Sequence, residues 1–533
     1  MQRIVRWAAV AALAACAPAA TPRSDSPSYD LLIAGGDVLD GTGSPAYRAD
    51  VGIRGGRIVA VSRLPMERSA AARVIDASGL TVAPGFIDLH AHLDPLLRLP
   101  DAESSVRQGV TTAVGGPDGG GPWPFAAYLD SAERVGTGLN VAFLVGHNTI
   151  RREVMGLANR APTPDELERM RGMVAQGMAE GAFGMSTGLR YLPGTFATTE
   201  EVVALARVAA DSGGIYTSHL REEGLGLLEG VSEAIRIARD ADVRVVLTHH
   251  KAVGTQMWGQ SVRTLAMVDS ARAARLDVRI DQYPYTATST SLAVLIPTWA
   301  LEGGDTAFAR RAATPTLRDS ITRGIVFNLL NDRGGGDLRR VQFARVGWDR
   351  TLEGKTLHDW VVREGIAATP ENAAALVIEA QLRGGGSGIY HVLDERDVEA
   401  IMRHPWTSIA SDGRLSRPGE GVPHPRGYGT FPRVLGVYVR ERGVLTLPDA
   451  VRKMTALPAA TLGLPDRGRI AEGMAADLAV FDPATVADRA TFQDPHQYPA
   501  GIPWVIVNGR IAVDDGRFTG ARAGRVLRRG ARP

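Results

Sequence analysis

Short apolar, β-branched runs alternate with helical stretches through most of this 533-residue chain. Strands that alternate with helices in this way pair in parallel, because each helix crosses over the sheet before the next strand begins. Eight such runs predict an α/β fold with a (β/α)8 barrel as its main domain. The expected strands are residues 82–90, 109–114, 140–145, 183–186, 215–218, 243–248, 278–282 and 407–411.

The two ends of the chain have a different pattern, in which short strands are broken by glycine. Residues 29–83 and 461–533 both have this pattern, and we expect them to pair in one small β-sandwich domain beside a barrel over 84–460. The gap from about 297 to 404 is too long for a single helical crossover. It predicts an insertion, a small subdomain before the last barrel strand.

The first residues resemble an export signal. Two arginines precede an apolar run at 7–15, which is too short to span a bilayer. The run ends in Leu-Ala-Ala-Cys, which is similar to the site in bacterial lipoproteins where the signal is cut and the cysteine is acylated. This resemblance implies a signal peptide over 1–15, a membrane anchor on Cys16, and a flexible tether over 16–28. We therefore expect an exported lipoprotein of the periplasm or cell envelope, with an ordinary cleaved signal as the alternative.

Charge and cysteine content exclude some functions. The chain has 60 basic and 58 acidic side chains, a balance that argues against a generic nucleic-acid binder. Its only cysteine is Cys16, so neither a disulfide framework nor a cysteine-based metal site can form within one chain. The sequence leaves the oligomeric state open.

Residue types that bind metals follow the carboxyl ends of five expected strands, where barrel active sites are built. Alone, each histidine has an ordinary interpretation as a hydrogen-bonded structural residue, and each Asp-Gly pair as a turn. Their recurrence at matching strand ends favours a metal centre for one or two divalent ions. The six candidates are His90, His92, Asp118, His219, His249 and Asp412.

Several motifs resemble the amidohydrolase superfamily. Pro-Gly-Phe-Ile-Asp-Leu-His-Ala-His at 84–92 is similar to its opening motif, and Glu-Gly-Met-Ala-Ala-Asp-Leu at 472–478 to its closing motif. More specific stretches resemble the D-aminoacylase (N-acyl-D-amino-acid deacylase) branch, and they lie at 181–189, 248–251, 281–285 and 424–432. The resemblance runs from about residue 30 to 515 and implies a zinc-dependent hydrolase barrel with a β-sandwich domain.

The resemblance also implies a role for each candidate ligand. The histidine pair of the first strand would hold an outer metal, and His219 and His249 an inner one. The family pattern Ser/Thr-His-X-Lys puts the ligand first, which favours His249 over His250. Asp412 would bind metal and act as general acid and base. The family bridges its two sites with a cysteine, where this chain has Asp118; since a carboxylate is a harder donor than a thiolate, one metal, two metals, or a metal other than zinc remain open.

The expected reaction is hydrolysis of a linear amide in a small-molecule N-acyl amino acid. A divalent metal gives a bound hydroxide near neutral pH. Asp412 would take the proton of that water and pass it to the leaving amine, releasing a carboxylate and a free D-amino acid. By resemblance, the substrate-binding residues would be Lys251, Tyr191, Tyr283 and Ser289.

Two other interpretations stay open. A cyclic amidase (dihydropyrimidinase-like) or a dipeptidase on the same scaffold is the first; such relatives often use a carboxylated lysine or a glutamate as the bridge, and no lysine lies near the early strands. A non-catalytic surface lipoprotein is the second, but it would be expected to lose the histidine pair or Asp412, and both are present. The side-chain, acyl-chain and stereochemical preferences are not specified by the sequence.

Overall fold

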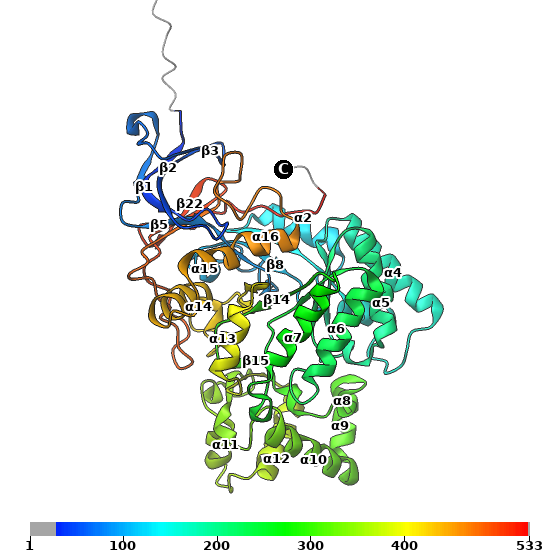
Figure 1. Cartoon of the computed structure of the whole chain (residues 1–533). Coiled ribbons are helices and arrows are strands. Elements are labelled where there is room, and N and C mark those ends of the chain that lie inside the picture. The colour runs from blue at the N-terminus through cyan, green and yellow to red at the C-terminus, as the bar shows by residue number, and fades with distance from the viewer. Residues whose placement is uncertain (1–27, 531–533) are drawn as a thin grey trace, which may run out of the picture.

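The computed structural model describes residues 28–530 of the chain (Figure 1). The expected signal peptide, most of the expected tether, and Cys16 lie outside the described residues. Within the described part of the chain, no helix is both long enough and apolar enough to cross a membrane.

Both ends of the chain contribute to one nine-stranded sheet, seen as blue and red-orange strands at the upper left of Figure 1. The link between the two ends is the antiparallel pairing of β5 with β20. Alternate apolar residues such as Val51, Ile53 and Ile506 point into a separate core on this sheet. Its strands are β1 (Leu31–Val38), β2 (Tyr47–Arg54), β3 (Arg57–Ser62), β4 (Val74–Asp76), β5 (Thr81–Pro84), β20 (Leu478–Phe481), β21 (Trp504–Val507), β22 (Arg510–Asp514) and β23 (Arg517–Phe518).

The middle of the chain forms two parallel sheets that follow one another in sequence order, β6-β8-β9 and β10-β11-β12-β13-β14-β18. One residue, Leu144, separates β9 from β10, and its N–H donates to the Gly115 carbonyl of β8. At the opposite end of the series, the Asp412 N–H donates to the His90 carbonyl. The strands are β6 (Phe86–Asp88), β8 (Val110–Gly115), β9 (Asn140–Phe143), β10 (Val145–Gly146), β11 (Gly184–Gly188), β12 (Ile215–His219), β13 (Arg244–Leu247), β14 (Val278–Gln282) and β18 (Thr407–Ile409).

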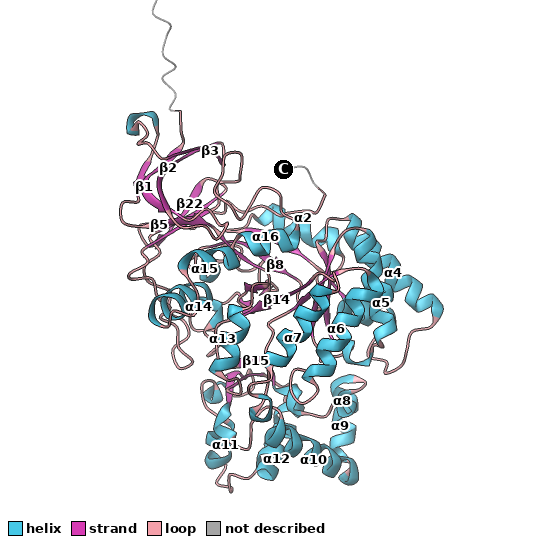
Figure 2. Ribbon diagram, viewed as in Figure 1, coloured by secondary structure: helices cyan, strands magenta, loops and turns pink. Residues whose placement is uncertain are grey.

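Helices surround these parallel strands (Figure 2). Some of these helices begin with a side-chain cap: Thr163 and Glu166 form a reciprocal capping box at α4, and the Thr198 side chain caps α5. Small and aliphatic residues on their inner faces pack on the strands in the largest apolar core. The helices are α1 (Glu103–Val106), α2 (Phe125–Val135), α3 (His147–Met155), α4 (Pro164–Ala179), α5 (Thr199–Asp211), α6 (Leu227–Ala241), α7 (Ser261–Ala273), α13 (Glu395–Arg403), α14 (Arg426–Arg433), α15 (Leu447–Met454) and α16 (Ala456–Leu462).

The expected first barrel strand, 82–90, is wrong as a single strand. Its first part is β5 in the nine-stranded sheet, and only β6 pairs with the parallel strand β8. The chain changes sheets at Gly85, whose N–H donates to the Asp477 carbonyl. A Cβ at Gly85 would lie 2.2 Å from the Thr111 side chain, so the close approach of the two segments requires glycine.

A subdomain with its own apolar core projects from the parallel strands, drawn in green at the bottom of Figure 1. Its three-stranded antiparallel sheet has the order β15-β17-β16, so it begins ahead of residue 297. Helix α13, near the end of the expected insertion, instead contacts α7 and β18 of the parallel-stranded domain. The remaining subdomain elements are β15 (Thr288–Ser291), α8 (Thr298–Leu301), α9 (Gly304–Ala313), α10 (Pro315–Asn331), β16 (Val341–Arg345), α11 (Leu357–Arg363), α12 (Pro370–Leu382) and β17 (Ser387–Tyr390).

The last described residues leave the nine-stranded sheet and run along the parallel-stranded domain. Val526 forms a parallel bridge with Val141 of β9. The Arg528 guanidinium pairs with Asp130 of α2 at 2.8 Å. This segment therefore ties the end of the chain to the domain that carries the candidate site.

Candidate metal centre

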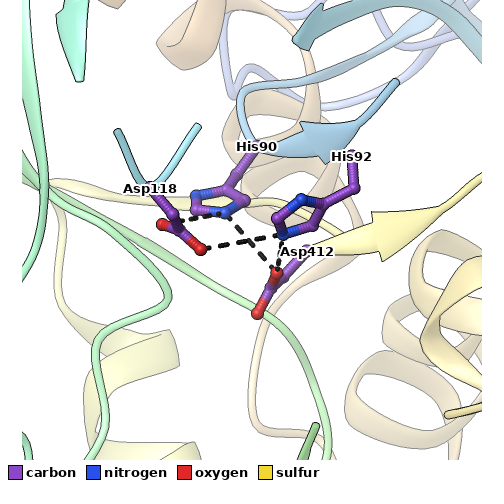
Figure 3. Close-up of side chains that lie close together, drawn as sticks. All are labelled: His90, His92, Asp118 and Asp412. Atoms are coloured by element: carbon purple, nitrogen blue, oxygen red, sulfur yellow. Dashed lines mark hydrogen bonds and ion pairs between the residues drawn. The ribbon is translucent and has the colours of Figure 1, made fainter. Parts of the chain in front are cut away.

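The six expected ligands, which come from segments far apart in the sequence, meet at the carboxyl ends of the parallel strands. They form two groups, and within each group the ligand atoms all lie within 4.8 Å of one another. Figure 3 shows the first group, with both imidazoles turned toward the two carboxylates. The groups are His90, His92, Asp118 and Asp412, and then Asp118, His219 and His249.

Asp118 is the member that the two groups share. Its Oδ1 lies 3.5 Å from His90 Nε2 and 3.3 Å from His249 Nε2. Its Oδ2 lies 3.7 Å from His92 Nε2 and 3.8 Å from His219 Nδ1. The Asp118 carboxylate thus faces four imidazoles. Each of its two oxygens lies near one histidine of the first group and one histidine of the second. A carboxylate in this position can contribute an oxygen to a cation held by either group.

Three of the six residues have a left-handed backbone. The φ angles are 53° at Asp118, 36° at His249 and 49° at Asp412. Such angles are uncommon for residues other than glycine, although Asp and His adopt them more readily than most. Each costs on the order of 1–3 kcal/mol and recurs at functional sites. At His249 the turn follows the end of β13 and directs this imidazole, rather than that of His250, to the cluster; His250 Nε2 lies 2.8 Å from Thr264 Oγ1.

The donor set fits a divalent metal. His90 is fully buried, and within the described part of the chain neither of its ring nitrogens has a hydrogen-bond partner. The same holds for Asp118 Oδ1. A buried polar group left in this state costs about 1–3 kcal/mol. Imidazole nitrogens and carboxylate oxygens are the ligands that zinc and similar cations prefer, so these residues can hold one or two divalent ions.

The surroundings keep both carboxylates of the cluster ionised. Burial works to raise the pKa of Asp118, but the His90 and His249 imidazoles hold it well below its usual range. Burial likewise opposes ionisation of Asp412, but the Arg426 guanidinium, 2.7 Å from its Oδ2, lowers the pKa of this group below that of an ordinary carboxyl. Both groups are therefore charged near neutral pH and available to a cation.

Glu223 is a site residue that sequence reasoning missed. It is buried behind the second group, with its Oε2 3.6 Å from His219 Nε2 and its Oε1 3.2 Å from His249 Nδ1. These are the ring nitrogens that point away from Asp118. A carboxylate in this position fixes the orientation and tautomer of a metal-binding imidazole. Its spacing of four residues from His219 is visible in the sequence. Its contact with His249 is not, because the two residues are far apart along the chain.

We expect Glu223→Gln to weaken metal binding, because the neutral amide orients both imidazoles less strongly. Changes to such supporting carboxylates typically cost roughly 10–100-fold in metal affinity. Competition with a chelator would measure the effect. Glu222→Gln is the matched control, since Glu222 pairs with Arg190 at 2.6 Å instead of with an imidazole. Equal losses in the two variants would contradict the role assigned to Glu223.

A cavity of about 400 Å³ opens beside the cluster, and three of the four expected substrate-binding residues line it: Tyr191, Lys251 and Ser289. Tyr283 is not among the lining residues; it is buried, with the Arg426 guanidinium over its ring at 4.9 Å.

The contacts of Lys251 and Tyr191 set the charge that each presents to the cavity. Lys251 Nζ lies 2.5 Å from Glu223 Oε1, so its charge is already paired. Burial, together with the charges of Asp118 and Glu223, raises the pKa of the Tyr191 phenol, which keeps its hydroxyl protonated.

Parallel α/β strands with a histidine–aspartate centre at their carboxyl ends are the arrangement of a metal-dependent enzyme. The chain belongs to the amidohydrolase family, whose profile matches residues 73–314 and 339–513. It is 41% identical to a D-aminoacylase of Alcaligenes xylosoxydans xylosoxydans, an alignment that covers 96% of this chain and 99% of the relative.

Two solved structures are also similar. A D-aminoacylase described with a binuclear metal centre, one-metal activation and second-metal attenuation has a TM-score of 0.80 and 38% identity, covering 94% of this chain and 100% of that one. N-acyl-D-glutamate deacylase from Bordetella bronchiseptica, in complex with zinc and a phosphonate inhibitor, has a TM-score of 0.79 and 36% identity, covering 94% and 99%.

Proposed function

We propose that this protein is a metal-dependent N-acyl-D-amino-acid deacylase, which hydrolyses a linear amide to a carboxylate and a free D-amino acid. The observation that carries this proposal is the cluster of four histidines and two aspartates beside a cavity of about 400 Å³. The similarity to D-aminoacylase over nearly the whole chain supports the amide and its D configuration. Zinc is the proposed metal, since the donors are imidazoles and carboxylates.

We further infer that the two parallel sheets close into one (β/α)8 barrel and that the nine-stranded sheet folds as a β-sandwich. The strands of the two sheets succeed one another in sequence order. Hydrogen bonds link β8 to Leu144 on one side and Asp412 to His90 on the other. Closure would bring the first and last strands together, which is what places the first histidine pair beside Asp412.

Asp412 is the proposed general acid and base. When bound, the metal supplies an acidified water and polarises the scissile carbonyl. Asp412 Oδ1 lies 3.1 Å from His92 Nε2, inside the cluster, while Oδ2 is held by Arg426. The ionised carboxylate accepts a proton from the attacking water and then donates it to the leaving nitrogen, which departs as an amine. The Asp412 carboxylate is regenerated at the end of each turnover.

Substrate would lie in the cavity with its α-carboxylate near Ser289 and Tyr191. Ser289 is in β15, and the Tyr191 hydroxyl accepts from Thr290 Oγ1 at 3.1 Å on the same strand. Lys251 and Tyr283 are the other two proposed contacts: the Lys251 ammonium is shared with Glu223 at 2.5 Å, and its Nζ lies 5.8 Å from the centre of the buried Tyr283 ring. Hydroxyl donors and a cation are the groups that a free carboxylate requires.

A hydrolysis screen with metal quantification tests the function. We expect the metal-loaded protein to cleave N-acetyl-D-amino acids and to leave their L counterparts, dihydropyrimidines and dipeptides largely intact. Preferential cleavage of dihydropyrimidines or dipeptides would replace the proposal with a cyclic amidase or a dipeptidase. Absence of bound metal and of all hydrolysis would favour a binding protein.

We propose that the mature protein is exported and anchored to a membrane through a lipid on Cys16. The support is the sequence of the first sixteen residues, which lie outside the described part of the chain. Cys16→Ser should move the protein from the detergent phase to the aqueous phase while the specific activity stays unchanged. Continued partition into detergent would contradict the anchor.

A further inference from the structure

The sheet of the inserted subdomain places three polar side chains in one row. Ser291 of β15 is the register partner of Ser387 in β17, and Ser387 is the register partner of Arg345 in β16. Register partners on neighbouring strands lie side by side on the same face of a sheet. All three residues line the cavity that contains the metal cluster. The row presents two hydroxyls and one guanidinium to whatever occupies that cavity.

A bulge in β16 directs Arg345 into the cavity. The pairing register of β16 and β17 shifts between Phe343 and Arg345. In a regular strand Ala344 and Arg345 would point to opposite faces, yet both line the cavity. Bulges re-aim side chains in this way and are frequent next to active sites.

Arg345 is also free to bind an anion. Five cationic side chains line the cavity, and three of them are paired: Lys251 with Glu223, Arg414 with Asp94, and Arg426 with Asp412. Arg345 and Arg98 are the other two. Among the described residues, no carboxylate lies close enough to either guanidinium to form an ion pair. Of these two, Arg345 has the adjacent serine hydroxyls.

The row begins next to the reacting groups. Arg426, which pairs with Asp412, also donates to the Ser289 carbonyl at 3.2 Å. Ser291 lies two residues further along the same strand, on the order of 7 Å away. A substrate with its α-carboxylate at Ser289 would therefore extend its side chain along β15, toward Ser387 and Arg345.

We propose that Arg345, with Ser291 and Ser387, binds a side-chain carboxylate, so that the preferred substrates are acidic N-acyl-D-amino acids of the glutamate or aspartate type. This inference rests on the proposed deacylase function and specifies its substrate class. Guanidinium–carboxylate pairs flanked by hydroxyl donors are among the strong polar contacts in proteins.

The test compares N-acetyl-D-glutamate with N-acetyl-D-glutamine, which have the same shape and the same α-carboxylate. We expect kcat/KM to be at least about tenfold higher for the glutamate, because the glutamine lacks the negative charge and so loses one charged hydrogen bond to Arg345. Arg345→Met should remove this preference mainly by raising KM for the glutamate, and leave the glutamine nearly unaffected. Arg98→Met is the matched control, because Arg98 lines the same cavity and is also unpaired.

Binding separates this inference from the proposed reaction. Calorimetric titration of metal-loaded Asp412→Asn protein with the same two ligands reports the preference without turnover. Tighter glutamate binding by this variant that depends on Arg345, together with a metal-loaded wild-type protein that cleaves neither compound, would overturn the deacylase and keep the carboxylate site. A wild-type preference for glutamine or for neutral side chains, or a preference lost in Arg98→Met alone, would overturn the site.

Discussion

Asp412→Asn should retain metal and lose turnover by about two to four orders of magnitude, the usual contribution of a positioned acid or base. Asparagine keeps the size of the side chain and one oxygen toward His92, but it cannot accept the proton of the attacking water. Its amide also loses the charge that pairs with Arg426 at 2.7 Å. Steady-state kcat and metal content, measured on the same preparation, check both parts.

Asp94→Asn is the control for this variant. Asp94 lines the same cavity and pairs with Arg414, but it is half exposed and outside both groups of candidate ligands. We expect it to keep most of the activity. An Asp412→Asn protein with wild-type kcat would contradict the acid–base role, and one that has lost its metal would contradict the expected retention of metal.

Asp118→Ala should lower the bound metal per chain more than any other single change to a carboxylate of the site. Asp118 is the only residue shared by the two groups, so its removal takes a ligand from both. The loss of affinity should exceed the roughly 10–100-fold that is typical for a supporting residue behind a ligand. Elemental analysis after dialysis against a weak chelator would measure it.

Asp94→Ala provides the comparison for this second variant, because it also removes one carboxylate from the cavity lining. The amount of metal bound per chain should stay at the wild-type value in Asp94→Ala. If Asp118→Ala also keeps the full complement of metal, Asp118 is not a ligand.

The position of the site could be predicted because strand ends are local features. Each of the six candidate residues follows an apolar run by no more than a few positions, and parallel strands bring their carboxyl ends to one rim. The pattern therefore indicated the cluster without any knowledge of which strand lies beside which. The choice of His249 over His250 likewise agrees with the geometry, through a left-handed turn that the sequence does not reveal.

Features that depend on distant contacts could not be predicted. Residues 82–90 look like one strand, but the chain passes from one sheet to another at Gly85 because a second segment, at Thr111, crosses there. Glu223 acquires its role only when His249 folds against it. Arg345 was not singled out because 57 arginines give no single one a distinctive signal, and its exposure to the cavity depends on a bulge.

The joining of both chain ends in one sheet bears on how the molecule is assembled. Arg57, beside the turn between β2 and β3, pairs with Asp466, which lies 409 residues later. Contacts between such remote positions form slowly, because a very long loop must close first. Until β20 arrives, β5 would present unpaired backbone groups at an open edge, a known hazard for aggregation. The nine-stranded sheet is therefore completed only after β20 to β23 have been synthesised, and we expect the open edge of β5 to be prone to aggregation until then.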